Sequence, residues 1–125
     1  MTYHVTKQQH VAAFMEAMGQ VFDASKEEEI IKLRQRLIME EAGEVYDELD
    51  RPVLNRVALT KELADLLYVV YGTAEQLSLP LEPAFSRVHR SNMSKLDDNG
   101  KPIYREDGKV LKGPKYEKPN LDELW

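Results

Sequence analysis

Two acidic side chains interrupt the apolar face of a segment with helical periodicity. At 3.6 residues per turn, Glu62 and Asp65 fall on one stripe with apolar neighbours. Those neighbours are Ala58, Leu59, Leu66, Val69 and Val70. Lys61 is predicted to point away from this stripe. Because an ionised carboxylate on an inward face costs several kcal/mol unless its charge is compensated, we expect a cation at this place.

The preceding helical segment repeats the pattern. Its apolar stripe, formed by Ile30, Leu33 and Leu37, continues as an acidic stripe within an arc of about 100°. The acidic members are Glu40, Glu41, Glu44 and Glu48. Such carboxylates are hydrated at a cleft, protonated, paired with Lys or Arg, or bound to a metal ion. No Lys or Arg lies on either stripe at the level of the carboxylates.

The spacing of these residues favours metal binding. Glu41 and Glu44 are three residues apart, as are Glu62 and Asp65, so each pair lies on one helix face and two facing helices can converge on one ion. Ligation by oxygen alone favours Mg²⁺, with Mn²⁺ as its substitute. A di-iron centre in a helical bundle requires Glu-x-x-His, and none of the three histidines follows a Glu by three residues. A glycine inside a helix lowers helix stability by about 1 kcal/mol relative to Ala, so the presence of Gly43 predicts that another helix approaches closely at this position.

Four helices are needed to position these residues. Periodicity predicts helices over residues 7–22, 26–49, 55–77 and 82–93, with Ser25 and Glu28 as a capping box for the second. The short link between the second and third helices predicts an antiparallel hairpin that brings the carboxylates together. After Lys95 the chain is irregular, and Asp107-Gly108 favours a short β-hairpin. The predicted fold is all-α: a four-helix bundle with an irregular C-terminal tail.

Composition limits the class of protein. With 125 residues, we expect one helical domain over residues 1–95 and a basic tail over residues 96–125. The absence of cysteine excludes disulfides, zinc-thiolate sites, iron–sulfur clusters and cysteine nucleophiles. The longest apolar run, residues 66–71, is far shorter than the ~20 residues that span a bilayer, so we expect a cytoplasmic protein without a membrane partner. A net charge of −5 disfavours nucleic acid as a partner.

The carboxylate motifs resemble those of a known superfamily. Glu40-Glu41-Ala42-Gly43-Glu44, followed after seventeen residues by Glu62-Leu63-Ala64-Asp65, is similar to the E-E-x-x-E and E-x-x-D pair of the all-alpha nucleoside triphosphate pyrophosphohydrolases. This MazG-like group includes dimeric dUTPases and phosphoribosyl-ATP pyrophosphohydrolase. The resemblance extends over about residues 10–95 and includes the segment from Val88 to Lys95.

The resemblance implies hydrolysis between the α and β phosphates to a nucleoside monophosphate and pyrophosphate. It implies Glu41, Glu44, Glu62 and Asp65 as Mg²⁺ ligands. Glu40 is expected to orient or deprotonate the attacking water, and Asn92 and Lys95 to bind phosphate or sugar. Glu48 is a candidate ligand of a further ion.

The resemblance leaves the substrate and the assembly open. A surplus or noncanonical deoxynucleotide, with a pyrimidine base, is the expected substrate, and the activity would be housecleaning of the nucleotide pool. The alternatives are phosphoribosyl-ATP hydrolysis and a non-catalytic nucleotide- or metal-binding bundle. As in members of the superfamily, we expect a homodimer or a dimer of dimers.

Simpler interpretations compete with these assignments. Acidic residues on helices usually form a solvated face, but here they alternate with Leu, Val and Ala. Phe14, Met15, Met18 and Phe22 are predicted to lie in the core or in a subunit interface. The basic tail is either a solvated segment or a lid that closes over phosphates.

Overall fold

The computed structural model describes residues 5–125; residues 1–4, which include His4, lie outside the described residues. The described chain is helical and contains no strand, which confirms the predicted all-α class with four helices. These helices are α1 (Lys7–Ala17), α2 (Glu27–Leu49), α3 (Arg56–Gln76) and α4 (Leu81–Met93). Contacts divide the chain into two compact units, Met1–Leu79 and Pro80–Trp125.

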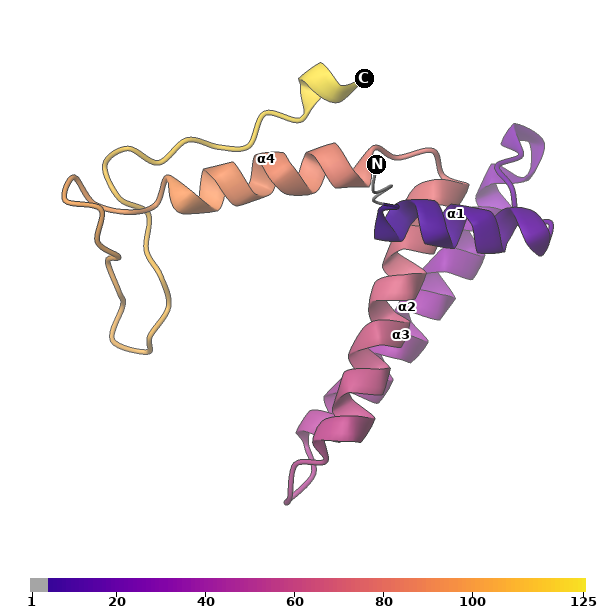
Figure 1. Ribbon diagram of the computed structural model, residues 1–125, viewed down its shortest axis with the longest axis horizontal. Coiled ribbons are helices and arrows are strands. Elements are labelled where there is room, and N and C mark those ends of the chain that lie inside the picture. Colours follow the sequence, from indigo (N-terminus) through magenta and orange to yellow (C-terminus); the bar gives the residue numbers. More distant parts are fainter. Residues whose placement is uncertain (1–4) are drawn as a thin grey trace. The chain divides into compact units, whose positions relative to one another are not determined.

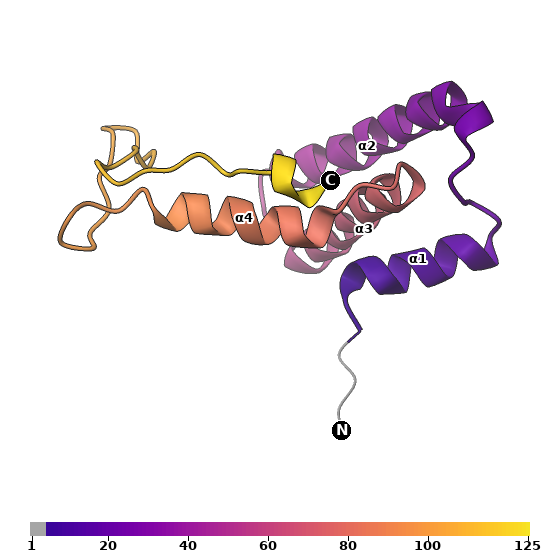
Figure 2. The same cartoon turned by 90° about the horizontal axis from the view of Figure 1, so that it is seen from above.

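The first unit is built on the hairpin of α2 and α3. These two long helices lie side by side, and α1 packs against α3 (Figures 1 and 2). Asn55 begins α3 as its N-cap, because its side-chain oxygen accepts the backbone N–H of Ala58 at 3.0 Å. The short connection between the helices makes them antiparallel, as predicted.

Two predicted features of helix ends are wrong. The first helix ends at Ala17 rather than at Phe22, because Gly19 takes a left-handed φ of 73° that stops the helix. Ser25 does not cap the second helix. It lies instead in a 3₁₀ turn, Ala24–Lys26, where Asp23 accepts the Ser25 backbone N–H at 3.0 Å and its hydroxyl at 2.7 Å.

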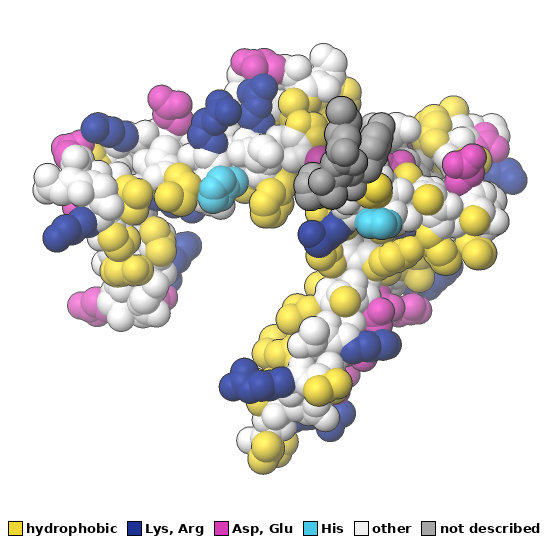
Figure 3. Space-filling model, in the orientation of Figure 1, with side chains coloured by type: hydrophobic (Ala, Val, Ile, Leu, Met, Phe, Trp, Pro, Cys, Tyr) yellow, Lys and Arg dark blue, Asp and Glu magenta, His cyan; other side chains and the backbone are white. Residues whose placement is uncertain are grey.

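The core of the first unit is small. Its buried apolar side chains are Val11, Met15, Ile30, Val45 and Ala74. Because α1 is short and packs on α3 along one edge, only Val11 and Met15 of its apolar residues are buried. Phe14, Met18 and Phe22 were predicted to lie in the core or in a subunit interface; they are between 44% and 59% exposed, so they lie outside the core of this chain, and the interface stays a prediction. Hydrophobic side chains gather over α1 and along α3 (Figure 3).

The predicted close approach at Gly43 is also wrong. A Cβ added at Gly43 would meet nothing within 4 Å. Gly72 on α3 is the buried glycine, and a Cβ there would lie 2.7 Å from Nη1 of Arg34. The close contact is therefore between an α2 side chain and the α3 backbone, two turns beyond the acidic residues of α3.

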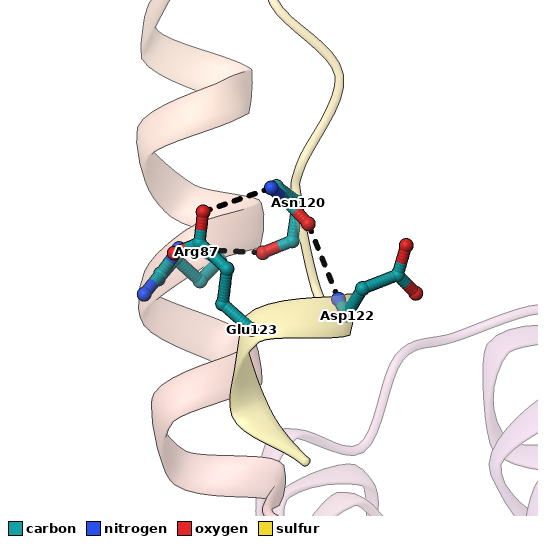
Figure 4. Close-up of polar contacts among 4 residues, drawn as sticks. All are labelled: Arg87, Asn120, Asp122 and Glu123. Atoms are coloured by element: carbon teal, nitrogen blue, oxygen red, sulfur yellow. Dashed lines mark hydrogen bonds and ion pairs between the residues drawn. The ribbon is translucent and has the colours of Figure 1, made fainter.

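The second unit consists of α4 and the tail that follows it. The Ser91 hydroxyl donates to the Glu117 carbonyl at 2.7 Å. Arg87 forms a 3.0 Å ion pair with Glu123, whose other carboxylate oxygen accepts from the Asn120 amide at 3.0 Å (Figure 4). These contacts fasten the tail along α4.

The expected β-hairpin is reduced to one antiparallel bridge between Tyr104 and Val110. Its turn contains Gly108 with φ of 88°, a conformation that glycine adopts without strain. Asp107 accepts hydrogen bonds from Arg105, which holds the pKa of this carboxyl below its ordinary value. Within residues 5–125, no helix has both the length and the apolar character needed to cross a membrane.

Candidate metal centre

Four carboxylates from the facing helices α2 and α3 meet in the first unit. One oxygen each from Glu41, Glu44, Glu62 and Asp65 lies within 4.8 Å of the other three. The spacing of three residues within each pair is what directs both side chains to the same face of a helix, and the antiparallel hairpin sets the two faces opposite each other. The structure thus brings together all four residues that were predicted as metal ligands.

Two of these four carboxylates have an oxygen without a hydrogen-bond partner in the described chain. Oε2 of Glu41 and Oε2 of Glu62 are buried and accept no hydrogen bond. A hydrogen bond with Glu44, together with burial, raises the pKa of the Glu62 carboxyl. Buried carboxylate oxygens without donors, in an all-oxygen set, fit a hard divalent cation such as Mg²⁺. The residues present therefore have the chemistry that Mg²⁺, the predicted cofactor, requires.

Lys61 does not point away from the carboxylates, contrary to the sequence-based prediction. Its Nζ lies 2.6 Å from Oδ2 of Asp65 and 3.6 Å from Oε1 of Glu62. A long side chain reaches a residue four positions later on the same helix, which the position of its Cα on the helical wheel did not reveal. The hydrogen bond with Asp65 raises the pKa of Lys61. Lys61 would therefore compete with a bound metal ion for Asp65.

Replacing Lys61 by Gln should tighten Mg²⁺ binding up to about fivefold, since an exposed ion pair is worth at most about 1 kcal/mol. Isothermal titration with MgCl₂ measures this change. Lys32→Gln is the matched control, because Lys32 forms an exposed ion pair with Glu28 at 3.3 Å on α2. Equal or weaker Mg²⁺ binding by Lys61→Gln would show that Lys61 does not compete with the ion.

The raised pKa of Glu62 predicts a dependence of stability on pH in metal-free buffer. Over the range between the ordinary glutamate pKa and the raised value, folded protein holds a proton that the unfolded chain has lost. The contribution of Glu62 to the free energy of unfolding therefore falls as pH rises through this range. Urea denaturation at several pH values with chelator should show this trend in the wild type and not in Glu62→Gln. Identical pH profiles would contradict it.

The remaining predicted site residues are placed as follows. Glu40 is exposed on α2, next to Glu41. Glu48 is buried and forms an ion pair with Arg51 at 2.8 Å, and its role as ligand of a further ion stays a prediction. Asn92 is exposed near the end of α4 in the second unit, and its carbonyl accepts the Lys95 backbone N–H at 3.2 Å. The roles assigned to Glu40, Asn92 and Lys95 stay predictions.

The buried charged residue Arg34 was not predicted from the sequence. Arg34 on α2 is only 5% exposed, and its Nε donates to Oε1 of Gln76 at 2.6 Å. Its Nη2 is buried and donates no hydrogen bond. The signal that points to it is register, because Arg34 precedes Glu41 by seven residues and so lies on the same face of α2 two turns away.

Comparisons with known proteins identify the family of the chain. A search of curated proteins finds no match. The family model described as phosphoribosyl-ATP pyrophosphohydrolase matches residues 11–92, which is more than half of the chain and includes all four carboxylates. The named activity is that of a nucleotide pyrophosphohydrolase, a hydrolase that acts on a phosphoric anhydride. This chain, with its carboxylate cluster between two antiparallel helices, belongs to the phosphoribosyl-ATP pyrophosphohydrolase family.

Proposed function

We propose that this protein hydrolyses a nucleoside triphosphate between its α and β phosphates, in a Mg²⁺-dependent reaction that gives the monophosphate and pyrophosphate. The observation that carries the proposal is the cluster of four carboxylates within 4.8 Å, two of which have buried oxygens without hydrogen bonds. A cluster with this excess negative charge binds a polyphosphate only through cations. The family match supports the class of reaction.

The residues of the chain have separate tasks in this reaction. Glu41, Glu44, Glu62 and Asp65 would hold Mg²⁺, which when bound neutralises phosphate charge and lowers the pKa of a water molecule. Glu40 is exposed beside this cluster, and its carboxylate would accept the proton of the attacking water. Water is added across the Pα–O–Pβ linkage, this linkage breaks, and the nucleoside monophosphate and pyrophosphate leave. Asn92 and Lys95 would donate hydrogen bonds to phosphate or sugar oxygens.

Two substrate classes share this bond cleavage. We favour a deoxypyrimidine triphosphate, removed as part of housecleaning of the nucleotide pool. Phosphoribosyl-ATP is the second candidate, because the matching family model carries its name. A bundle that binds nucleotide or metal without turnover is the remaining alternative.

We propose a homodimer or dimer of dimers in the cytoplasm. Large apolar side chains on α2 and α3 are exposed in the single chain, and a second copy would cover them. They include Met39 (70% exposed), Tyr46 (67%) and Val57 (82%). Sedimentation equilibrium of the purified protein measures the stoichiometry directly.

The function is tested by incubating purified protein with Mg²⁺ and a panel of ribo- and deoxynucleoside triphosphates plus phosphoribosyl-ATP. Chromatography then separates monophosphate from diphosphate, and a coupled assay detects pyrophosphate. Monophosphate and pyrophosphate, formed only with the metal, are the expected products. Diphosphate and inorganic phosphate would contradict the proposed bond, and the absence of any product would favour the non-catalytic alternative.

A further inference from the structure

A small cavity in the first unit adjoins the buried guanidinium of Arg34. Its volume is about 130 Å³, and α1, α2 and α3 all contribute to its walls. Apart from Arg34 and Gln20, the walls are mainly apolar and aromatic: Val11, Phe14, Met15, Leu37, Tyr68 and Val69, closed by Gly72. The edge of one aromatic ring faces the other, since the Phe14 and Tyr68 ring centres are 5.5 Å apart at 78°.

Arg34 supplies a hydrogen-bond donor that the chain leaves unused. No ion pair joins it to a carboxylate in the described part of the chain, and its charge is compensated only by the amide oxygen of Gln76. Nη2 is buried without an acceptor. A buried donor that lacks an acceptor is costly, and a buried charged one more so. A hydrogen-bond acceptor from outside the chain would therefore satisfy the free donor of Arg34.

Gly72 fixes where the guanidinium lies. A Cβ at this position would be 2.7 Å from Nη1 of Arg34 and 3.5 Å from Sδ of Met15. The guanidinium thus lies against the backbone of α3 at Gly72, close to the sulfur of Met15 on α1. A larger residue would push it out of this position.

Residues that line the cavity lie seven positions from those of the carboxylate cluster on both α2 and α3. Arg34 and Leu37 precede Glu41 and Glu44 by seven residues on α2, while Val69 and Gly72 follow Glu62 and Asp65 by seven residues on α3. Seven residues are about two turns and about 10 Å along a helix. Because the helices are antiparallel, all four shifts run in the same direction along the hairpin. The cavity therefore lies on the same inner faces as the carboxylates, about 10 Å from them along the hairpin.

Size and polarity define what fits. A buried apolar cavity of about 150 Å³ accepts benzene, so this cavity of about 130 Å³ has room for one six-membered ring, with an open side at Phe14 and Tyr68, which are 44% and 42% exposed. Apolar walls suit the ring faces. Arginine only donates hydrogen bonds, so the ligand must offer an acceptor at its edge. A pyrimidine base, with its ring carbonyl oxygen, combines these properties.

We propose that the Arg34 cavity binds the pyrimidine base of the substrate, with the guanidinium donating to a ring carbonyl oxygen. This inference rests on the proposed function, since it takes the phosphates of the same nucleotide to lie at the carboxylate cluster. It makes Arg34 and Gly72 determinants of base specificity.

The test measures binding of products rather than turnover. Isothermal titration in Mg²⁺ compares dCMP, dUMP and dAMP, with pyrophosphate as a probe of the carboxylate cluster. The wild type should bind a pyrimidine monophosphate at least tenfold more tightly than dAMP. Arg34→Met should lose this preference and keep its affinity for pyrophosphate. Arg36→Met is the matched control, because Arg36 is exposed on the same helix.

Folding of the variants is checked by thermal unfolding. Arg34→Met should fold, since it replaces a buried charge, one of whose donors has no acceptor, with an apolar chain of similar length. Gly72→Ala is the second variant: its Cβ displaces the guanidinium while leaving the arginine in the sequence, and it should also weaken pyrimidine binding at least tenfold.

The outcomes separate this inference from the proposed function. Pyrimidine selectivity that disappears in both variants supports the cavity as a base site, even if no triphosphate is hydrolysed. Hydrolysis in which both variants keep the wild-type ranking of bases would overturn the base site and leave the proposed function standing. Equal loss of affinity for dAMP and pyrimidines would likewise overturn it, because Arg34 would then act through a shared part of the nucleotide.

Discussion

Glu62→Gln is expected to lower Mg²⁺-dependent hydrolysis about a thousandfold, equivalent to about 4 kcal/mol of transition-state stabilisation. Glu62 contributes a buried oxygen without a hydrogen-bond donor to the carboxylate cluster. The amide keeps the size of the side chain but removes its charge, so Mg²⁺ would be held by three carboxylates instead of four. Initial rates of pyrophosphate release at saturating nucleotide, together with titration of Mg²⁺, measure both consequences.

The matched control for this variant is Asp47→Asn. Asp47 is exposed on α2 and lies outside the cluster, so its amide variant should retain activity within about twofold, consistent with the small effects of surface substitutions. Circular dichroism should give the same helix content for both variants. A fully active Glu62→Gln protein with unchanged Mg²⁺ affinity would refute the assignment of the cluster as the metal centre.

Met15→Ala should destabilise the protein by about 3 kcal/mol, the middle of the range for truncation of a buried methionine. Met15 is 3% exposed and is one of two buried apolar residues by which α1 is anchored. Its sulfur also lies over Gly72, so truncation would enlarge the cavity beside Arg34. Urea denaturation followed by circular dichroism gives the free energy of unfolding.

Met18→Ala provides the comparison within the same segment. Met18 is 59% exposed as the C-cap of α1, and its truncation should change stability by no more than about 0.5 kcal/mol. Periodicity alone placed both methionines on one apolar stripe. Equal destabilisation by the two variants would mean that Met18 is covered in the native assembly, for example by a second copy of the chain.

The secondary structure was largely predictable because local signals agreed with one another. Three of the four helices begin and end within one residue of their predicted limits, helped by Asn55 as a cap and by the break at Pro52. The first helix was predicted to be too long, because its apolar spacing continues beyond Gly19, whose left-handed φ ends the helix. A periodic pattern shows which residues share a face and does not show where the backbone departs from the helix.

The four carboxylates of the candidate metal centre could also be selected from the sequence. Glu41, Glu44, Glu62 and Asp65 occupy apolar stripes, and burial of unpaired charge is too costly to be accidental. Lys61 and Arg34 were not recognised. The reach of Lys61 depends on its rotamer, and the burial of Arg34 depends on Gly72 and Met15 from two other helices. Spacing places Arg34 on the acidic face of α2 and Lys61 four residues before Asp65, but it does not show which rotamer a side chain adopts or what buries it.

The sequence by itself determined four helices, their order, and two acidic pairs on faces that a short hairpin must oppose. Those properties follow from periodicity of 3.6 residues and from the length of one connection. Only the tertiary structure decided that four oxygens approach within 4.8 Å, that Lys61 turns toward them, and that Arg34 is buried beside a cavity two turns away. The reason is that α2 and α3 can slide or rotate relative to each other without changing either helical pattern, and only the packing of side chains selects one register.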